Sequence, residues 1–289
     1  MKPAAFDYAV PATLAEAVAL LAQHGGEAKA ISGGQSLMPM LNFRLTSPAM
    51  LVDLRRISEL HGVDIKPTGT RLGARTRWCD IEKSSALAAA QPLLCAAIAH
   101  VAHYQVRNRG TVGGSIVHAD PAAEMPGLSV ALDAQLRLVG AKGERMVPAA
   151  EFFTGPLSTV IESDEVLVEV LLPAWPAARR WGFQEFARRR GDYALAGAAV
   201  WYDLDGNGSI INAHVAIIGA SDRPRRLPTV ESVLNGRKPD AASFAAAAQA
   251  TSAAVDPMTD VHASAEYRRA LAGTMVERAL SDAAQRVAA

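Results

Sequence analysis

The stretch TVGGSIVHADPAAEMP, residues 111–126, places a glycine pair between two hydroxyl residues with no lysine after it. A second stretch, AISGGQSLMP at residues 30–39, repeats the order of an apolar run, a glycine pair and polar side chains. Binding a diphosphate without a metal requires several convergent N–H donors, and glycine permits both close approach and positive φ. The two matching stretches therefore predict two loops that share one dinucleotide site.

Neither stretch fits the two best-known phosphate-binding motifs. No Gly-Lys-Ser/Thr follows either glycine pair, which excludes a P-loop, and Gly-x-Gly-x-x-Gly is absent, which excludes a Rossmann fingerprint. A single Gly-Gly pair is usually only a turn, so the prediction depends on the two stretches acting together.

The composition narrows the class of protein. The 289 residues include 29 Lys+Arg and 29 Asp+Glu, so bulk charge argues against non-specific nucleic-acid binding. Cys79 and Cys95 are too few for an iron–sulfur cluster or a structural zinc on this chain's own thiolates, and we interpret them as free thiols. With no signal-peptide pattern at the N-terminus and no apolar run long enough to span a membrane, a cytoplasmic protein is expected.

Local patterns predict a mixture of helices and strands that do not alternate regularly, which favours an α+β fold. Thr13 and Glu16 form a capping box for a helix that glycines end at residues 25–26. Further predictions are buried strands at 28–31 and 50–54, a hairpin at 62–74, a helix at 92–102, a helix at 126–134, strands at 134–140 and 165–173, a hairpin turning at 205–208, and helices across 227–286.

Two domains are expected, because prolines, glycines and tryptophans cluster at residues 173–182. We predict one domain at residues 1–175, with two subdomains that divide near residues 55–60, and a second at residues 176–289. The sequence DLDGNG at 203–208 resembles a calcium loop only superficially, because no later glutamate follows, and we interpret it as a turn.

Four ordered motifs carry a family resemblance that covers nearly the whole chain. They are SGGQSLMPMLNFRL at 32–45, RNRGTVGGSIVHADPAAEMP at 107–126, RRRGDYALAG at 188–197 and HASAEYRRALAG at 262–273. Together they resemble the flavoprotein (medium) subunit of molybdenum hydroxylases, a family that includes the carbon monoxide dehydrogenase medium subunit and the flavin domain of xanthine dehydrogenase. The resemblance implies a two-subdomain FAD-binding domain of the PCMH type, followed by a smaller α+β domain with a three-stranded sheet and a helical bundle.

The resemblance also implies which residues contact FAD. Residues 30–37 would contact the adenosine and pyrophosphate, residues 111–115 would form a second pyrophosphate loop, and an aromatic and an apolar residue would lie beside the flavin ring. The implied contacts are Ala30, Ile31, Ser32, Gly33, Gly34, Gln35, Ser36, Leu37, Val101, Thr111, Val112, Gly113, Gly114, Ser115, Asp120, Glu124, Leu167 and Tyr193.

Several of these assignments have alternatives. Asp120 competes with Glu124 for one polar contact, and Tyr193 is either the residue that covers the ring or a core residue at a strand start. Glu185 stands where many relatives have a lysine, so a cation from residues 188–190 would have to replace it, unless those arginines are a solvated turn. Arg44, Arg107 and Arg109 are candidates for phosphate or partner contact, or are simply exposed.

The function that the resemblance implies is electron transfer through a non-covalent FAD, with no catalytic residue and no metal ligand on this chain. Partner subunits would be a large molybdenum-binding chain with molybdopterin and a small chain with 2Fe-2S clusters, assembled as a dimer of heterotrimers. Two alternatives are a self-sufficient FAD oxidoreductase that acts directly on a small molecule, with His118 or His103 as its base, and an assembly scaffold that has lost FAD. The organic substrate and the electron acceptor are not determined by this sequence.

Overall fold

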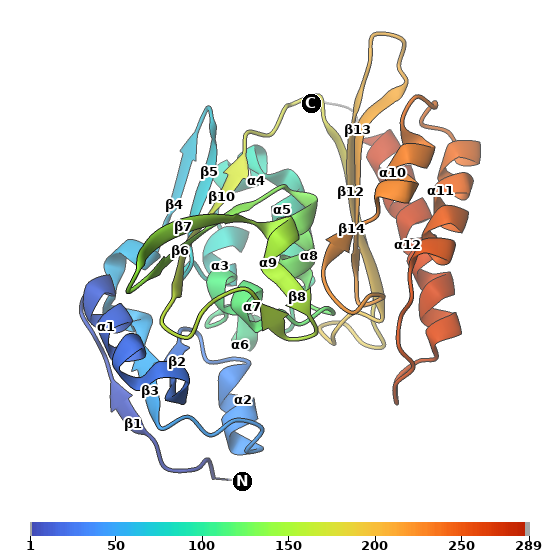
Figure 1. The fold of residues 1–289 in the computed structure, drawn as a ribbon. Coiled ribbons are helices and arrows are strands. Elements are labelled where there is room, and N and C mark those ends of the chain that lie inside the picture. The colour runs from blue at the N-terminus through green and yellow to red at the C-terminus, as the bar shows by residue number, and fades with distance from the viewer. Residues whose placement is uncertain (1, 287–289) are drawn as a thin grey trace.

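The computed structural model describes residues 2–286, which form three parts that follow one another along the chain (Figure 1). The N-terminal part is a parallel sheet with the strand order β1-β3-β2. Its elements are β1 (Asp7–Ala9), α1 (Leu14–His24), β2 (Ala28–Ile31), α2 (Leu37–Asn42) and β3 (Met50–Asp53), with 3-10 turns at Gly25–Glu27, Leu54–Arg56 and Ser58–Leu60. The predicted capping box of α1 and both predicted strands are confirmed.

The central part contains an antiparallel sheet with the order β4-β5-β10-β6-β7. Its strands are β4 (Val63–Lys66), β5 (Gly69–Gly73), β6 (Gln135–Gly140), β7 (Gly143–Pro148) and β10 (Val166–Pro173), and a small sheet pairs β8 (Phe153–Gly155) with β9 (Ser158–Thr159). Its helices are α3 (Trp78–Glu82), α4 (Ser85–Ala90), α5 (Pro92–Ile98), α6 (Tyr104–Arg107), α7 (Val112–His118), α8 (Glu124–Ala131) and α9 (Ala149–Phe152). The predicted helix at 92–102 ends early, at Ile98, and the backbone then turns to a positive φ at Ala102.

The C-terminal part is an antiparallel sheet with the order β11-β12-β13-β14, covered by long helices. The elements are β11 (Arg180–Phe186), β12 (Ala196–Leu204), β13 (Ile210–Ile218), β14 (Arg225–Arg226), α10 (Pro228–Leu234), α11 (Ala241–Ala254) and α12 (Ala265–Gln285). The two-residue strand β14 adds a fourth strand to the three that were expected. The hairpin prediction is confirmed, because the Gly208 N–H donates to the Asp205 carbonyl at 2.9 Å between β12 and β13.

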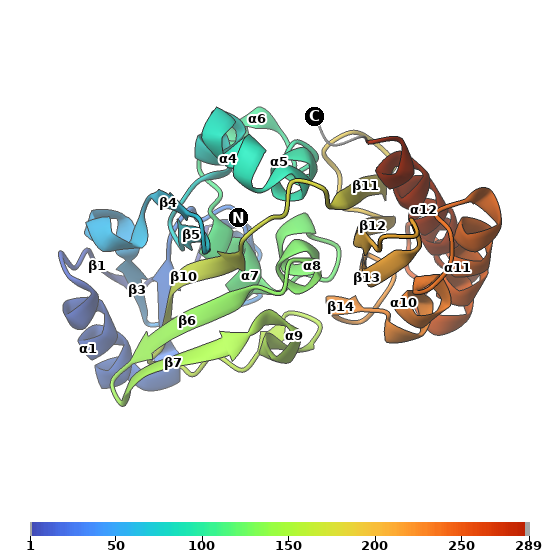
Figure 2. The ribbon, with the colours of Figure 1, turned by 90° about the horizontal axis from the view of Figure 1, so that it is seen from above.

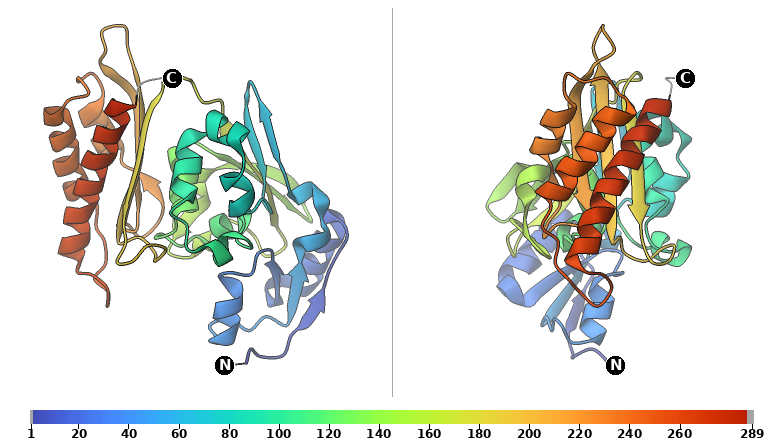
Figure 3. Two further views of the ribbon diagram at one scale, coloured as in Figure 1. Left: turned by 180° about the vertical axis from the view of Figure 1, so that it is seen from behind. Right: turned by 90° about the vertical axis from the view of Figure 1, so that its right-hand side faces the viewer.

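Both faces of the C-terminal sheet are buried, which explains why β12 is apolar throughout its first seven residues. Ala198 and Val200 point to the core formed with α10, α11 and α12, whereas Ala199 and Trp201 point to the core shared with α5 and α8. Figure 3 shows the helices on the outer face, and Figure 2 shows α5 and α8 between this sheet and the central sheet. The Trp201 indole donates to the Ala131 carbonyl at 2.6 Å, so it ties the end of α8 to the C-terminal sheet.

The N-terminal and central parts share a smaller core. Ala17, Val18 and Leu21 of α1 pack with Val166 and Val168 of β10 in one apolar cluster. The parallel sheet is therefore held against the central sheet, with the ends of its strands near the central helices (Figure 1). None of the helices within residues 2–286 has the length and apolar character needed to cross a membrane.

Candidate cofactor site

The first glycine-containing stretch leaves the carboxyl end of β2 and leads into the short helix α2. Gly34 has a positive φ of 72°, and the Gln35 side chain donates to the Gly33 carbonyl at 3.0 Å, which fixes the turn. Across the described residues 2–286, no acceptor is recorded for the backbone N–H groups of residues 33–36. Consecutive N–H groups without an internal partner suit an anionic ligand, as the sequence predicted for this stretch.

The second glycine-containing stretch differs from the loop that the sequence predicted. Thr111 is the N-cap of α7, and its hydroxyl accepts a hydrogen bond of 3.2 Å from the Gly114 N–H. Gly113 and Gly114 are therefore in the first turn of a helix and do not have a positive φ. The expectation of a glycine loop is wrong here, because a threonine at the N-cap and the carbonyls around it stabilise a helical turn.

The backbone donors at the start of α7 already have protein acceptors. The Val112 N–H donates to the Thr76 carbonyl at 3.0 Å, and the Gly113 N–H donates to the Ala74 carbonyl at 2.8 Å. A Cβ on Gly113 would lie 2.6 Å from the Ala74 Cβ, so glycine is needed there for close packing. What α7 offers a ligand is consequently the hydroxyl group of Ser115 rather than a set of free N–H groups, because the Thr111 hydroxyl is engaged with Ser32 and Gly114.

The two stretches meet directly. The Thr111 hydroxyl donates to the Ser32 hydroxyl at 3.2 Å, and a Cβ on Gly33 would overlap the Arg109 carbonyl. A cavity of about 570 Å³ adjoins this junction. Its lining includes Ile31, Ser32, Gly33, Gly34 and Gln35 from the first stretch, Arg109 just before the second, and Phe6, Tyr8, Met38, Pro39, Asn42, Leu51, Asp53 and Arg55.

One wall of this cavity is a polar network that sequence reasoning missed. The Arg55 side chain donates to the Asp53 carboxylate at 2.7 Å, and the Tyr8 hydroxyl also donates to that carboxylate. Although burial opposes it, hydrogen bonds from Arg55 and Tyr8 hold the pKa of Asp53 below its ordinary value. A usable signal was present, because Asp53 ends a predicted strand and ligand sites in parallel sheets lie at the carboxyl ends of strands.

A cluster of acidic groups lies where the central and C-terminal parts meet. Glu124, the first residue of α8, is only 6% exposed, and burial with the nearby charge of Asp120 raises its pKa to about 7. Burial and the charge of Glu124 raise the pKa of Glu185 on β11 to about 8. Position 185, where the family resemblance suggested a cation, thus holds a second acid, which is half-buried.

Tyr193 connects this cluster to the first stretch. Burial, followed by the charges of Asp120 and Glu124, raises its pKa to about 12, while a side-chain contact with Ser36 acts in the opposite direction. The residue as a whole is nevertheless 57% exposed, so much of its side chain remains accessible. Ser36, Tyr193 and the acidic pair are thereby neighbours, although they come from three parts of the chain.

The remaining predicted contacts differ in burial. Val101 and Leu167 belong to the large central core and are 8% and 4% exposed. Ala30, the third residue of β2, is exposed, and Leu37, which begins α2, is half-buried.

Among the charged candidates, Arg107 and Arg188 have acidic neighbours, whereas Arg44 is exposed and Arg109 lines the cavity. Arg107 pairs with Glu82 at 2.9 Å and donates to two backbone carbonyls, so it holds the turn before α6. The Arg188 guanidinium lies 3.9 Å from the Asp192 carboxylate. Burial lowers the pKa of His118, although the charge of Asp120 acts in the opposite direction. Residues 2–286 contain no group of three His, Cys, Asp or Glu side chains placed to hold a metal ion.

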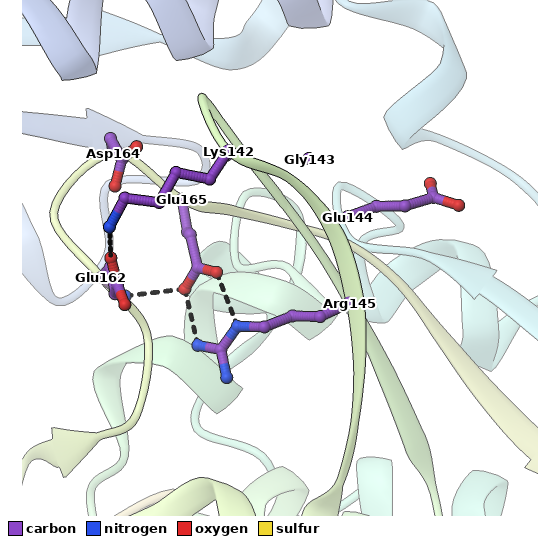
Figure 4. Close-up of a pocket in the computed structure, with 8 residues that line it drawn as sticks. Lys142, Gly143, Glu144, Arg145, Glu162, Asp164 and Glu165 are labelled. Atoms are coloured by element: carbon purple, nitrogen blue, oxygen red, sulfur yellow. Dashed lines mark hydrogen bonds and ion pairs between the residues drawn. The ribbon is translucent and has the colours of Figure 1, made fainter.

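A second pocket, of about 130 Å³, lies at the β6–β7 hairpin (Figure 4). Its charges are paired with each other, since Arg145 contacts Glu165 at 2.7 Å and Lys142 contacts Glu162 at 3.3 Å. None of the predicted contacts lines this pocket, and we assign no ligand to it.

Comparison with known proteins decides the family. Residues 4–175 match the FAD binding domain in molybdopterin dehydrogenase, and residues 181–283 match the CO dehydrogenase flavoprotein C-terminal domain. The chain belongs to the family of FAD-binding flavoprotein subunits of molybdenum hydroxylases. The family, the α+β fold, the oxidoreductase class and FAD as the cofactor of this family's domain are therefore confirmed as the sequence predicted.

Relatives in this family are similar along their whole length. The 6-hydroxypseudooxynicotine dehydrogenase complex subunit alpha of Paenarthrobacter nicotinovorans is 40% identical, with 99% of this chain and 97% of the relative covered. The carbon monoxide dehydrogenase medium chain of Hydrogenophaga pseudoflava is 39% identical, with both chains covered completely.

Solved structures in the family superpose closely on the fold. Carbon monoxide dehydrogenase from Hydrogenophaga pseudoflava gives a TM-score of 0.96 at 39% identity over 100% of both chains. Quinoline 2-oxidoreductase from Pseudomonas putida 86 gives a TM-score of 0.93 at 39% identity over 99% of both chains.

Proposed function

We propose that this chain binds one FAD non-covalently and serves as the electron-transfer subunit of a multi-subunit molybdenum hydroxylase. The observation that carries the proposal is the junction of the two glycine-containing stretches beside a cavity of about 570 Å³, where the N–H groups of residues 33–36 have no acceptor within residues 2–286. That volume is typical of a cofactor pocket, which usually measures roughly 300–1,000 Å³.

The residues present fit a dinucleotide. A Cβ at Gly33 would close the junction, the N–H groups of residues 33–36 suit a diphosphate, and the hydroxyls of Ser32 and Ser115 add uncharged donors, while the Thr111 hydroxyl donates to Ser32. On this proposal residues 30–37 hold the nucleotide end together with residues 111–115. Val101, Leu167 and Tyr193 serve the ring end, and Asp120 and Glu124 supply polar contacts.

FAD, when bound, supplies the redox chemistry, accepting electrons from clusters and passing them to an external acceptor. This chain's own residues bind the cofactor, orient it and limit its exposure to water. The proposed partners are a large molybdenum-binding subunit and a small 2Fe-2S subunit, in a dimer of heterotrimers. Support comes from relatives whose names describe them as a medium chain or as one subunit of a dehydrogenase complex. A cytoplasmic location remains part of the same proposal.

We also propose a domain boundary near residues 175–176, with the first domain divided into subdomains near residues 55–60. Two observations support it: the family matches end at 175 and begin again at 181, and the strand pairing changes from the central to the C-terminal sheet across this segment. The parallel sheet ends at Asp53, shortly before the proposed subdomain division.

The first test is the flavin content of the purified full-length chain. We expect about one FAD per chain, released into the supernatant when the protein is precipitated with acid. Flavin that pellets with the polypeptide would contradict non-covalent binding, and a folded chain that takes up no FAD would favour a scaffold role.

The second test separates electron transfer from direct catalysis. The purified chain is mixed with a candidate substrate and an artificial acceptor, with and without its large and small partner subunits. We expect turnover only after reconstitution, while the lone flavin still accepts electrons from an artificial reductant. Turnover by the lone chain would overturn the proposal in favour of a self-sufficient FAD oxidoreductase.

A further inference from the structure

Glu124 and Glu185 come from different parts of the chain and face a common junction. Glu185 on β11 pairs with Gly197 of β12, which in turn pairs with Ile218 of β13. A Cβ built on Gly197 would lie 3.5 Å from the Glu185 Cγ and 3.4 Å from the Ile218 Cβ, so these side chains share one face of the sheet.

Helix α8 crosses that same face. A Cβ on Gly127 would come within about 2.5 Å of the Ile218 Cγ1, so α8 packs directly against Ile218 and leaves no room for a larger residue at position 127. Glu124 lies three residues before Gly127, and residues at i and i+3 lie on one side of a helix. Glu124 therefore lies at the same face of the sheet as Glu185, near enough for its charge to raise the pKa of the Glu185 carboxyl.

Among the residues that the structure describes, neither carboxyl has a cationic partner. The Glu185 Oε2 atom is buried without a hydrogen-bond partner, and no Lys, Arg or His contributes to the pKa of either residue. The other ionisable groups around the pair are Asp120, which raises the pKa of Glu124, and Tyr193, whose own pKa both acids raise. Two further ionisable groups lie on the elements packed nearby. Asp282 of α12 accepts a hydrogen bond of 2.7 Å from the Gln184 side chain. His100, which follows α5, has its pKa lowered by burial, which favours its neutral form.

Two nearby carboxyls without a cation, one buried and one on a half-buried residue, cannot both ionise at low cost. They titrate as a unit, so the values of about 7 and about 8 belong to the pair rather than to either residue. Near neutral pH the pair consequently retains at least one proton.

We propose that Glu124 and Glu185 form a shared proton-binding site between the two domains, and that the entry of an anionic dinucleotide into the cleft drives uptake of a proton onto it. The proposal rests on the proposed FAD function. The step is an acid–base one: a proton from solvent binds a carboxylate oxygen, one negative charge is neutralised, and no electron is transferred. Tyr193 joins the pair to the cofactor stretch through its contact with Ser36.

The direction in which FAD affinity changes with pH follows from the negative charge of the ligand. A diphosphate brings negative charge to the Ser36 side of the cleft, which disfavours ionised carboxyls nearby and raises their pKa further. Ligand binding then takes up protons, so the affinity falls as pH rises, by at most about tenfold per pH unit for one proton. Below the pKa values of the free pair, the affinity becomes independent of pH.

The experiment uses the full-length chain stripped of flavin. FAD is titrated by fluorescence from about pH 6 to about pH 9, and the Kd is expected to rise at least about fivefold between pH 7 and pH 9. Calorimetry in two buffers of different ionisation enthalpy counts the protons taken up at about pH 8, where we expect a substantial fraction of one proton.

The variants Glu185→Gln and Glu124→Gln are expected to lose most of this uptake and to bind FAD more tightly than the wild type at high pH. Glu277→Gln, an exposed position on α12, is the matched control and should behave as the wild type. If a pair variant fails to fold, the infrared difference spectrum of the wild type on FAD binding replaces it, and a gained band of a protonated carboxyl is expected.

The outcomes separate the two proposals. The shared proton site would be overturned if the wild type binds FAD with a pH-independent Kd and takes up no proton. It would also be overturned if proton uptake persists in both pair variants, or if the infrared spectrum gains no carboxyl band. Absence of FAD binding at every pH would instead contradict the proposed function.

Discussion

The Thr111 hydroxyl joins the two glycine-containing stretches, because it accepts from the Gly114 N–H and donates to the Ser32 hydroxyl, both at 3.2 Å. One hydroxyl has the capacity for both roles. It thus caps α7 and fixes the stretch that follows β2. The candidate site depends on this junction between the parallel sheet and the central helices.

Gly33→Ala is expected to separate the two stretches. The new Cβ would overlap the backbone carbonyl of Arg109, which no side-chain rotation relieves. We expect a loss of about 1–3 kcal/mol in the free energy of unfolding and an FAD affinity at least about tenfold weaker. Denaturant unfolding and flavin fluorescence titration measure the two effects. Gly26→Ala, where a Cβ meets nothing within 4 Å, is the control, and equal behaviour of the two variants would place Arg109 away from Gly33.

Gly113→Ala tests the packing of α7. Its Cβ would lie 2.6 Å from the Ala74 Cβ, so we expect a destabilisation of about 1–3 kcal/mol, even though alanine favours a helix by about 1 kcal/mol over glycine. Gly114→Ala meets only the Thr111 hydroxyl at 2.8 Å and should cost less stability. Denaturant unfolding measures the free energy of unfolding of both variants. A Gly113→Ala variant as stable as the wild type would show that α7 does not pack against Ala74.

Tyr193→Ala is expected to change the environment of the flavin more than its retention. Stacking of an aromatic ring contributes on the order of 1 kcal/mol, which is small beside a diphosphate held by several donors. The variant should retain FAD and show a changed flavin absorption spectrum and changed rates with external acceptors. Tyr104→Ala, another exposed tyrosine, serves as the control. An unchanged spectrum together with unchanged rates would remove Tyr193 from the site.

Asp53→Asn is expected to lower stability at neutral pH, because it weakens the network with Tyr8 and Arg55. The pKa of Asp53 is held below its ordinary value, so its stabilising contribution is complete above a pH of about 4. It is lost as pH falls through the lower pKa of the folded state. The difference in unfolding free energy between variant and wild type should therefore shrink in acid, and a difference that grows in acid would contradict this account. Asp256→Asn, with a side chain 96% exposed, is the control.

Much of the local structure was predictable. The capping box of Thr13 and Glu16 acts within one helical turn, and the Asp205–Gly208 turn satisfies its own backbone. Such signals need no partner from elsewhere in the chain, so a single sequence contains them completely. The same holds for the apolar runs of β2 and β3, and for the motifs that identified the family.

The sequence by itself determined the family, the α+β class and the presence of two related glycine-containing stretches. Only the tertiary structure decided that the second stretch begins a helix, because its N–H groups find the carbonyls of Ala74 and Thr76. It also brought Glu124 to Glu185 and Tyr8 to Asp53. The physical reason is that capping and turns depend on neighbours along the chain, whereas burial and unpaired charge depend on which distant residues share the same space.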